Sequence, residues 1–183
     1  MSGTERLVTA EEFARMPEDD LDRYELVEGR LVRMTPVNAD HGRTVAQITY
    51  LLKAHLKNRP AGIAVVETGF TLASNPDTVR GADVAFLRQE RAPAPGTRGF
   101  PRIAPDAVFE VLSPDDRPAE VRAKIDEYMR RGVHLVVVVD PDDKTVVAYR
   151  PGTQPLTLRE DSDVLDMADV IAGFTCRVSD IFE

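Results

Sequence analysis

Two short apolar segments separated by one helix constrain the fold of this chain most. Residues 107–112 and 135–139 are rich in β-branched side chains, a pattern typical of central strands that are covered on both faces. Between them, Pro118 is suited to begin a helix and Gly132 to end it. Strand, helix and strand within about 30 residues fit a right-handed parallel crossover. The sequence therefore predicts an α/β fold.

Other segments extend this mixed sheet and its helices. Thr9-Ala-Glu-Glu12 has the form of a capping box, and Glu28-Gly29 separates two strand-like runs as a tight hairpin turn does. Apolar residues recur at helical spacing from His41 to Asn58. Further expected elements are strands at 63–72, 82–87, 146–149 and 156–158, and a helical turn at 178–182.

The size and composition of the chain predict one globular domain. Its 183 residues, 43% hydrophobic and 30% charged, suffice to bury a core, so we expect a single domain over residues 1–183. Residues 91–105 hold four prolines and two glycines, which favours a mobile surface loop over a domain linker. The single Cys176 has no partner for an internal disulfide and is expected to fill a buried position.

The charge and hydropathy of the chain limit the classes of partner that we expect for it. A formal net charge of -8 with no basic tract gives no broad attraction to phosphate backbones, which counts against nucleic-acid binding. No apolar run reaches the roughly 18 residues that a membrane span needs, and the first residues lack the apolar core of a signal peptide. We therefore expect a cytoplasmic protein without membrane association.

Two acidic residues interrupt otherwise apolar strands. Glu110 lies within Ala107–Leu112, and Asp83 lies within Gly81–Leu87. A buried carboxylate costs several kcal/mol unless a positive or hydrogen-bonding group meets it, so the two strands suggest a shared cation. With a third acid such as Glu25, they could hold one or two Mg²⁺ ions through oxygen ligands and water.

Lys124 is predicted to lie on the sheet-facing side of the helix that follows Glu110. It shares that side with Val121, Ile125 and Tyr128, so its ammonium could point at the carboxylates, or could extend outward to solvent. A cation and a lysine together provide the parts for phosphodiester hydrolysis. The alternative is a buried ion network without chemistry.

The chain resembles the Uma-type restriction endonucleases, a branch of the PD-(D/E)XK nuclease superfamily, over roughly residues 7–183. The matching pieces are Tyr24-Glu-Leu-Val-Glu-Gly29, Thr35-Pro36 followed by His41, Asp83-Val-Ala-Phe, Phe109-Glu-Val-Leu-Ser-Pro114, Lys124 with Tyr128, Gly132-Val133, Val139-Asp-Pro141, and Gly173-Phe174 before Phe182. The resemblance implies a restriction-endonuclease-like mixed β-sheet core flanked by helices.

The resemblance also implies the site. Asp83 and Glu110 would be the metal-binding acids, Glu25 the upstream acid, and Lys124 the catalytic lysine. In the wider superfamily the lysine usually stands two residues after the second acid, where this chain has Leu112. A lysine on the following helix can reach the same point. Ala82 replaces the motif's proline, which shapes the strand and does no chemistry.

We expect a Mg²⁺-dependent endonuclease acting on DNA, with Mn²⁺ as a possible substitute and a homodimer as the assembly. The alternative is a catalytically inactive module that binds nucleic acid or a protein partner. His41 could line the site and donate to a phosphate, or could cap the helix that it precedes. Arg117 could reach a phosphate or form a surface salt bridge.

Overall fold

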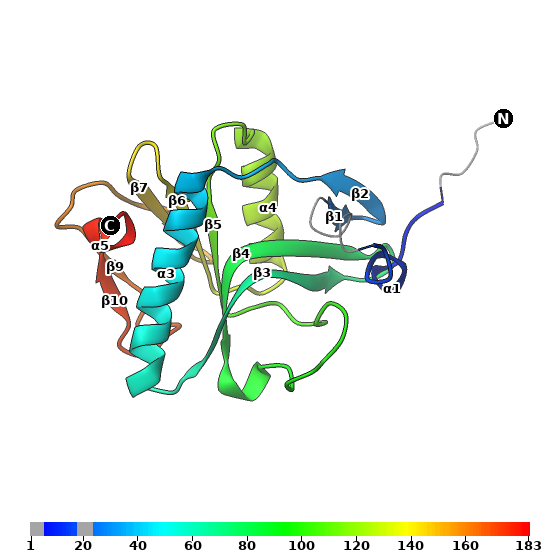
Figure 1. Cartoon of the computed structure of the whole chain (residues 1–183), viewed down its shortest axis with the longest axis horizontal. Coiled ribbons are helices and arrows are strands. Elements are labelled where there is room, and N and C mark those ends of the chain that lie inside the picture. Colours follow the sequence, from blue (N-terminus) through cyan, green and yellow to red (C-terminus); the bar gives the residue numbers. More distant parts are fainter. Residues whose placement is uncertain (1–5, 18–23) are drawn as a thin grey trace.

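An eight-stranded mixed sheet forms the centre of the computed structural model, which describes residues 6–17 and 24–183 (Figure 1). Its strand order is β2-β1-β4-β5-β6-β7-β8, and β3 pairs with β4 beside this path. The strands of this sheet are β1 (Tyr24–Val27), β2 (Arg30–Arg33), β3 (Gly62–Ala73), β4 (Thr78–Arg88), β5 (Ala107–Val111), β6 (Leu135–Asp140), β7 (Thr145–Tyr149) and β8 (Leu156–Leu158). The remaining elements are α1 (Ala10–Phe13), α3 (Ala39–Asn58), η1 (Gln89–Arg91), α4 (Pro118–Arg130), β9 (Val164–Asp166), β10 (Thr175–Arg177) and α5 (Val178–Ile181).

The predicted crossover is confirmed at the middle of the sheet. β5 and β6 run parallel, in register from Ala107↔Leu135 to Val111↔Val139, and α4 connects them. Pro118 occupies the first turn of α4, and Gly132 follows its end with a φ of +88°. Glycine adopts this left-handed conformation at little cost, so it can reverse the chain into β6.

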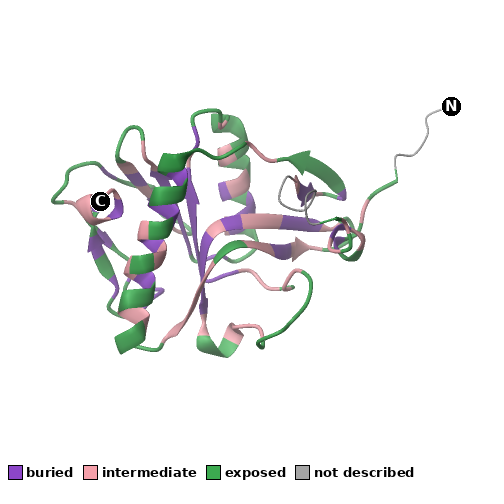
Figure 2. Ribbon diagram, viewed as in Figure 1, coloured by how far each residue is buried: buried purple, intermediate pink, exposed green. Residues whose placement is uncertain are grey.

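Each face of the sheet is covered by different helices. Side chains from α3, α5, β9 and β10 pack on one face together with alternate residues of β5 and β6, including Phe109 and Val137. α4 packs on the other face, where Ile125 and Tyr128 contact the intervening residues, including Val108 and Val136. Both central strands are therefore buried on both sides, as Figure 2 shows for β5 and β6.

The structure differs from the sequence prediction at three places. β4 begins at Thr78, four residues before the predicted start, because Arg80 and Gly81 continue the pairing with β3 despite weak strand propensity. α3 begins at Ala39, where the side chain of Asn38 accepts a hydrogen bond from the backbone of His41 at 2.9 Å. The short strands β9 and β10 were not predicted, since each has three residues and only one buried side chain.

The turn at Glu28-Gly29 forms the predicted hairpin between β1 and β2. Both residues have positive φ angles, +49° and +76°, as a type I′ turn requires. Beside it, the predicted capping box is present at Thr9, and Phe13 of α1 packs with Leu26. The rings of Phe13 and Phe100 stack with their centroids 5.1 Å apart. This contact ties the loop that contains Phe100 to the hairpin end of the sheet.

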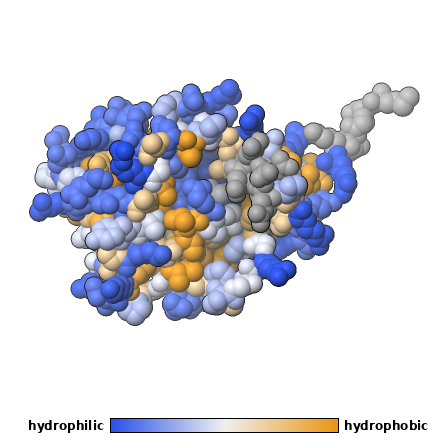
Figure 3. Space-filling model, viewed as in Figure 1, coloured by the Kyte–Doolittle hydropathy of each residue, from blue (hydrophilic) through white to orange (hydrophobic). Residues whose placement is uncertain are grey.

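The surface is mainly hydrophilic on the face seen in Figure 3, where hydrophobic residues gather near the centre, beside α3. Cys176 is buried, as expected, and burial raises the pKa of its thiol to about 12. Within the described ranges, none of the helices combines the length and hydropathy that a membrane crossing demands.

Removing the ring of Phe109 is expected to destabilise the protein strongly. Phe109 is 1% exposed in the central strand, and Phe109→Ala should lower the free energy of unfolding by about 3–5 kcal/mol because it leaves a cavity. Urea denaturation measures this. Tyr50→Ala, on the exposed side of α3, is the control and should cost under about 0.5 kcal/mol. Equal losses in the two variants would contradict the packing described here.

Candidate active site

A fork in the sheet creates the candidate site. β3 pairs along one edge of β4, whereas β1 and β5 share the other edge: β1 pairs at Val79, and β5 pairs at Val84–Phe86. Between the segment of β4 that pairs with β1 and the segment that pairs with β5, side chains bind the backbone of β4 in place of a neighbouring strand. Glu25 Oε1 accepts the amide hydrogen of Gly81 at 2.9 Å, and the Tyr128 hydroxyl donates to the carbonyl of Gly81 at 3.1 Å. The fork therefore opens a space at the centre of the fold.

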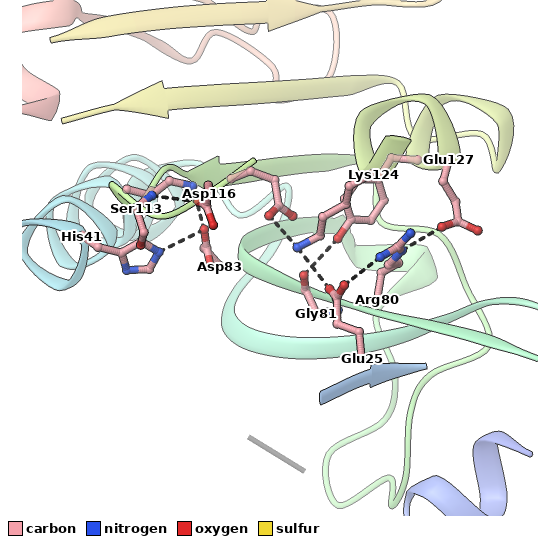
Figure 4. A network of polar contacts seen from close by, with 12 residues as sticks. Glu25, His41, Arg80, Gly81, Asp83, Ser113, Asp116, Lys124 and Glu127 are labelled. Carbon is pink, nitrogen blue, oxygen red and sulfur yellow. Dashed lines mark hydrogen bonds and ion pairs between the residues drawn. The ribbon is translucent and has the colours of Figure 1, made fainter. Parts of the chain in front are cut away.

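Glu110 and Lys124 meet in this space. Lys124 Nζ lies 2.7 Å from Glu110 Oε2 and 3.1 Å from Glu25 Oε1. Figure 4 shows the side chain of Lys124 directed from α4 toward Glu25. The Lys124 ammonium thus points at the carboxylates, which is one of the two orientations that the sequence allowed. Glu110 Oε1 is buried and has no hydrogen-bond partner among the described residues. One buried oxygen of the site is therefore unsatisfied by the protein.

Burial controls the ionisation of this pair. Burial raises the pKa of Glu110 to about 8; Lys124 opposes the shift, and the charge of Asp83 adds to it. Burial would lower the pKa of Lys124, but the surrounding carboxylates of Glu110 and Glu25 outweigh it and raise that pKa well above its ordinary value. Lys124 stays charged, and Glu110 needs further positive charge to ionise fully at neutral pH.

Asp83 lies beside Glu110 at the start of the β4–β5 pairing. Its Oδ2 accepts the amide hydrogen of Val111 at 2.6 Å and lies 3.3 Å from Nε2 of His41. The β3–β4 register passes from Val66↔Val84 to Thr68↔Ala82 with no pair between, and Glu67 there has a φ of +45°. This irregularity accompanies the turn of Asp83 toward β5.

His41 lines the site from the first turn of α3. It is buried and contacts Asp83, while the backbone of this turn is capped by Asn38. Burial would lower its pKa, but the hydrogen bond and charge of Asp83 outweigh burial and raise it. The acid that His41 contacts thus favours its protonated form.

Glu25 belongs to a second group of charges behind Lys124. Arg80 Nη1 lies 2.8 Å from Glu25 Oε2, and Arg80 Nε lies 2.7 Å from Glu127 Oε2. Burial would raise the pKa of Glu25, but the charges and hydrogen bonds of Lys124 and Arg80 lower it overall. Glu25 is therefore a fully ionised carboxylate whose two oxygens both have partners.

A cavity of about 260 Å³ opens onto these side chains. Its polar lining includes Glu25, His41, Asp83, Glu110, Asp116 and Lys124, and apolar residues of β2 and the following segment, such as Val32 and Met34, form another wall. Arg117 also lines the cavity, exposed and 3.5 Å from Glu120 in the surface ion pair that the sequence allowed.

The loop at residues 91–105 lies away from this cavity, because none of its residues is among the lining. Arg91 pairs with the buried Asp106 at 2.6 Å, and Thr71 donates its amide hydrogen to the carbonyl of Pro101 at 2.8 Å. The loop is thus anchored at its first residue and again near its end.

The residues of the site fit a divalent cation by their chemistry. In the part of the chain that the structure describes, no group of three or more His, Cys, Asp or Glu residues is arranged to hold a metal. Mg²⁺, however, commonly uses one or two carboxylates with water and substrate phosphate. Glu110 Oε1, which has no hydrogen-bond partner among the described residues, lies beside the carboxylate of Asp83, and burial, together with the charge of Asp83, raises the pKa of Glu110. These two carboxylates are a donor set of that kind.

The fold and this site together define a restriction-endonuclease-like protein. The family model of Uma2, described as "Putative restriction endonuclease", matches residues 10–179, and the chain belongs to this family. A solved structure of a putative nuclease of the DUF820 family from Anabaena variabilis is 22% identical. It superposes with a TM-score of 0.83 over 96% of this chain and 97% of that one, which shows the shared fold. The search of curated proteins returned no match.

Three residues of the site were missed by sequence reasoning. Arg80 and Glu127 form the bridge behind Glu25, and Asp116 lines the cavity while its carboxylate accepts the amide hydrogen of Ser113. Glu127 carried a usable signal, since it follows Lys124 by three residues and so lies beside it on α4. Arg80 and Asp116 lie in segments whose pairing the sequence does not reveal.

The raised pKa of Glu110 predicts how metal-free stability changes with pH. Between the ordinary pKa of 4.5 and about 8, the folded state keeps a proton on Glu110 that the unfolded state releases. Relative to Glu110→Gln, the wild type should lose free energy of unfolding as pH rises through this window, by up to about 1.4 kcal/mol per pH unit. Urea denaturation in EDTA from pH 5 to 8 tests this, and a constant difference between the two proteins would contradict it.

Proposed function

We propose that this protein is a Mg²⁺-dependent endonuclease that hydrolyses phosphodiester bonds in DNA. One observation carries the proposal: Glu110, with a buried oxygen lacking a partner, lies next to Asp83 and Lys124 in an open cavity. Membership of the restriction endonuclease family supports the same reaction class. Mn²⁺ is expected to substitute for Mg²⁺, since both accept carboxylate and water oxygens.

In this proposal Asp83 and Glu110 hold the cation. When bound, it would act as a Lewis acid that lowers the pKa of water and shields the charge of the scissile phosphate. Asp83 is fixed by the Val111 amide and His41, so its carboxylate is already oriented before substrate arrives. Lys124 holds a permanent positive charge at the same point, where it can orient the attacking water or stabilise the developing negative charge.

The cavity rim offers contacts for the substrate backbone. Arg117 at the start of α4 and Arg33 at the end of β2 both line the opening, and we propose that they contact phosphates on either side of the scissile bond. His41 is the third proposed substrate contact. A two-fold dimer would present two such cavities to the two strands of DNA, and we propose this assembly in the cytoplasm.

The net charge of -8 favours one second candidate, a catalytically inactive module that binds nucleic acid or a protein partner. In that case the carboxylates and Lys124 form a closed ion network. Calorimetric titration with Mg²⁺ or Mn²⁺ separates the two functions, since an absence of binding at millimolar metal supports the module and not the nuclease.

Loss of either proposed metal acid should abolish cleavage. Asp83→Asn and Glu110→Gln are each expected to reduce metal-dependent nicking of supercoiled plasmid at least about 100-fold, because each removes one of two anionic ligands. Nicking is followed on gels with Mg²⁺, with Mn²⁺ and with EDTA. Asp161→Asn, an exposed acid outside the cavity lining, is the matched control and should cleave like the wild type. Equal cleavage by all four proteins would refute the proposed function.

A further inference from the structure

We propose that Glu25 is a positioning residue that holds Lys124 in place, and that Arg80 in turn fixes Glu25. The three residues then form a clamp, and Glu25 does not bind the cation. This inference rests on the proposed function, because the clamped lysine is the one assigned to hydrolysis. It reassigns the acid that the family resemblance would place among the metal ligands.

The hydrogen bonds of Glu25 are the first observation that supports the clamp. Oε1 accepts from the Gly81 amide at 2.9 Å and from Lys124 Nζ at 3.1 Å, while Oε2 accepts from Arg80 Nη1 at 2.8 Å. Two of these donors are cations, and charge-assisted bonds are the stronger kind. Both lone pairs of Oε1 are in use, so a cation could bind there only by displacing a donor, and at Oε2 it would meet the positive charge of Arg80. Glu110 differs, since one of its oxygens accepts no hydrogen bond from the residues that the structure describes.

Arg80 is built into the fold as the support of Glu25. Its guanidinium spans two buried acids on different elements, Glu25 on β1 and Glu127 on α4. Arginine presents its donors in a rigid planar fork, so one side chain can fix the direction of both carboxylates. Arg80 is itself 12% exposed, which limits exchange of these bonds with water. The position of Glu25 therefore depends on Arg80.

The clamp keeps the Lys124 ammonium in the cavity when a cation binds there. Lys124 bridges Glu110 Oε2 and Glu25 Oε1 in the structure, and a cation at Glu110 Oε1 would bind the same carboxylate as Lys124. Two positive charges on one carboxylate repel each other, so the ammonium needs a second anion to remain in the cavity. Glu25 supplies that anion. Lys124 can then act beside the cation and is not expelled by it.

Mn²⁺ affinity separates a clamp from a ligand without any cleavage assay. Calorimetric titration of the full chain with Mn²⁺ should give Glu25→Gln and Arg80→Met dissociation constants within about threefold of the wild type, whereas Glu110→Gln weakens binding at least tenfold. Glutamine keeps the shape of Glu25 and an oxygen that can accept from the Gly81 amide. A tenfold loss in Glu25→Gln, equal to that of Glu110→Gln, would overturn the inference.

The Lys124 ammonium reports the clamp directly. In the wild type its ζ-NH₃⁺ group should give a slowly exchanging nitrogen-proton NMR signal, assigned by its loss in Lys124→Met. Arg80→Met and Glu25→Gln should broaden it, while Arg80→Lys retains it in part. Arg150→Met is the matched control, because Arg150 bridges Asp169 and the carbonyl of Asp166 outside the cavity lining. An unchanged signal in Arg80→Met, as in this control, would overturn the inference.

Cleavage kinetics complete the test. Glu25→Gln and Arg80→Met should lower kcat by roughly 10- to 100-fold with little change in KM, and Arg80→Lys should recover part of the loss. A rise in KM with unchanged kcat would contradict a positioning role. If the wild type neither binds Mn²⁺ nor cleaves DNA, the proposed function fails, and the ammonium signal alone still decides whether the clamp exists.

Discussion

A carboxylate inside a fully covered strand is the constraint on which the rest of the structure depends. Glu110 lies between Phe109 and Val111 in β5, with helices on both faces of the sheet. Its desolvation must be offset, and Lys124 offers one hydrogen bond to one of its oxygens. An apolar residue at position 110 would serve the stability of the fold better than a carboxylate does. The incomplete compensation of Glu110 is the observation on which the proposed cation site depends.

The fork on β4 explains how such a site can exist in the middle of a sheet. A continuous ladder would use every backbone group of β4, and no side chain could approach Gly81. Because β1 and β5 pair with different ends of the same edge, the acids of β1, β4 and β5 converge on the gap between them. α4 then brings Lys124 and Tyr128 over this gap. Lys124, on a helix, thus reaches the acids of the neighbouring strands.

The sequence was sufficient for those parts of the fold that local patterns determine. The apolar runs of β5 and β6, the helix between them and the turn at Glu28-Gly29 all carry their own signals, and each formed where it was predicted. The direction of Lys124 followed from helical spacing, although extension of its side chain to solvent remained an open alternative from the sequence alone.

The support behind the site could not be predicted in the same way. Arg80 precedes Gly81, before the predicted start of the strand, and its two partners lie 55 and 47 residues away in the chain. Such pairings depend on the register of β1 against β4, which rests on a single residue pair, Leu26↔Val79. The contact of His41 with Asp83 likewise depends on how the start of α3 docks near β4. Long-range docking of this kind leaves no periodic trace in the sequence.

A crystal structure of the wild-type protein soaked in Mn²⁺, with anomalous diffraction data, shows whether Asp83 and Glu110 hold a cation. One anomalous peak is expected in the cavity, within coordination distance of carboxylate oxygens of both Asp83 and Glu110. Lys124 should remain hydrogen-bonded to Glu25 beside it. A cavity without a peak at saturating Mn²⁺, or a peak bound by neither acid, would contradict the account.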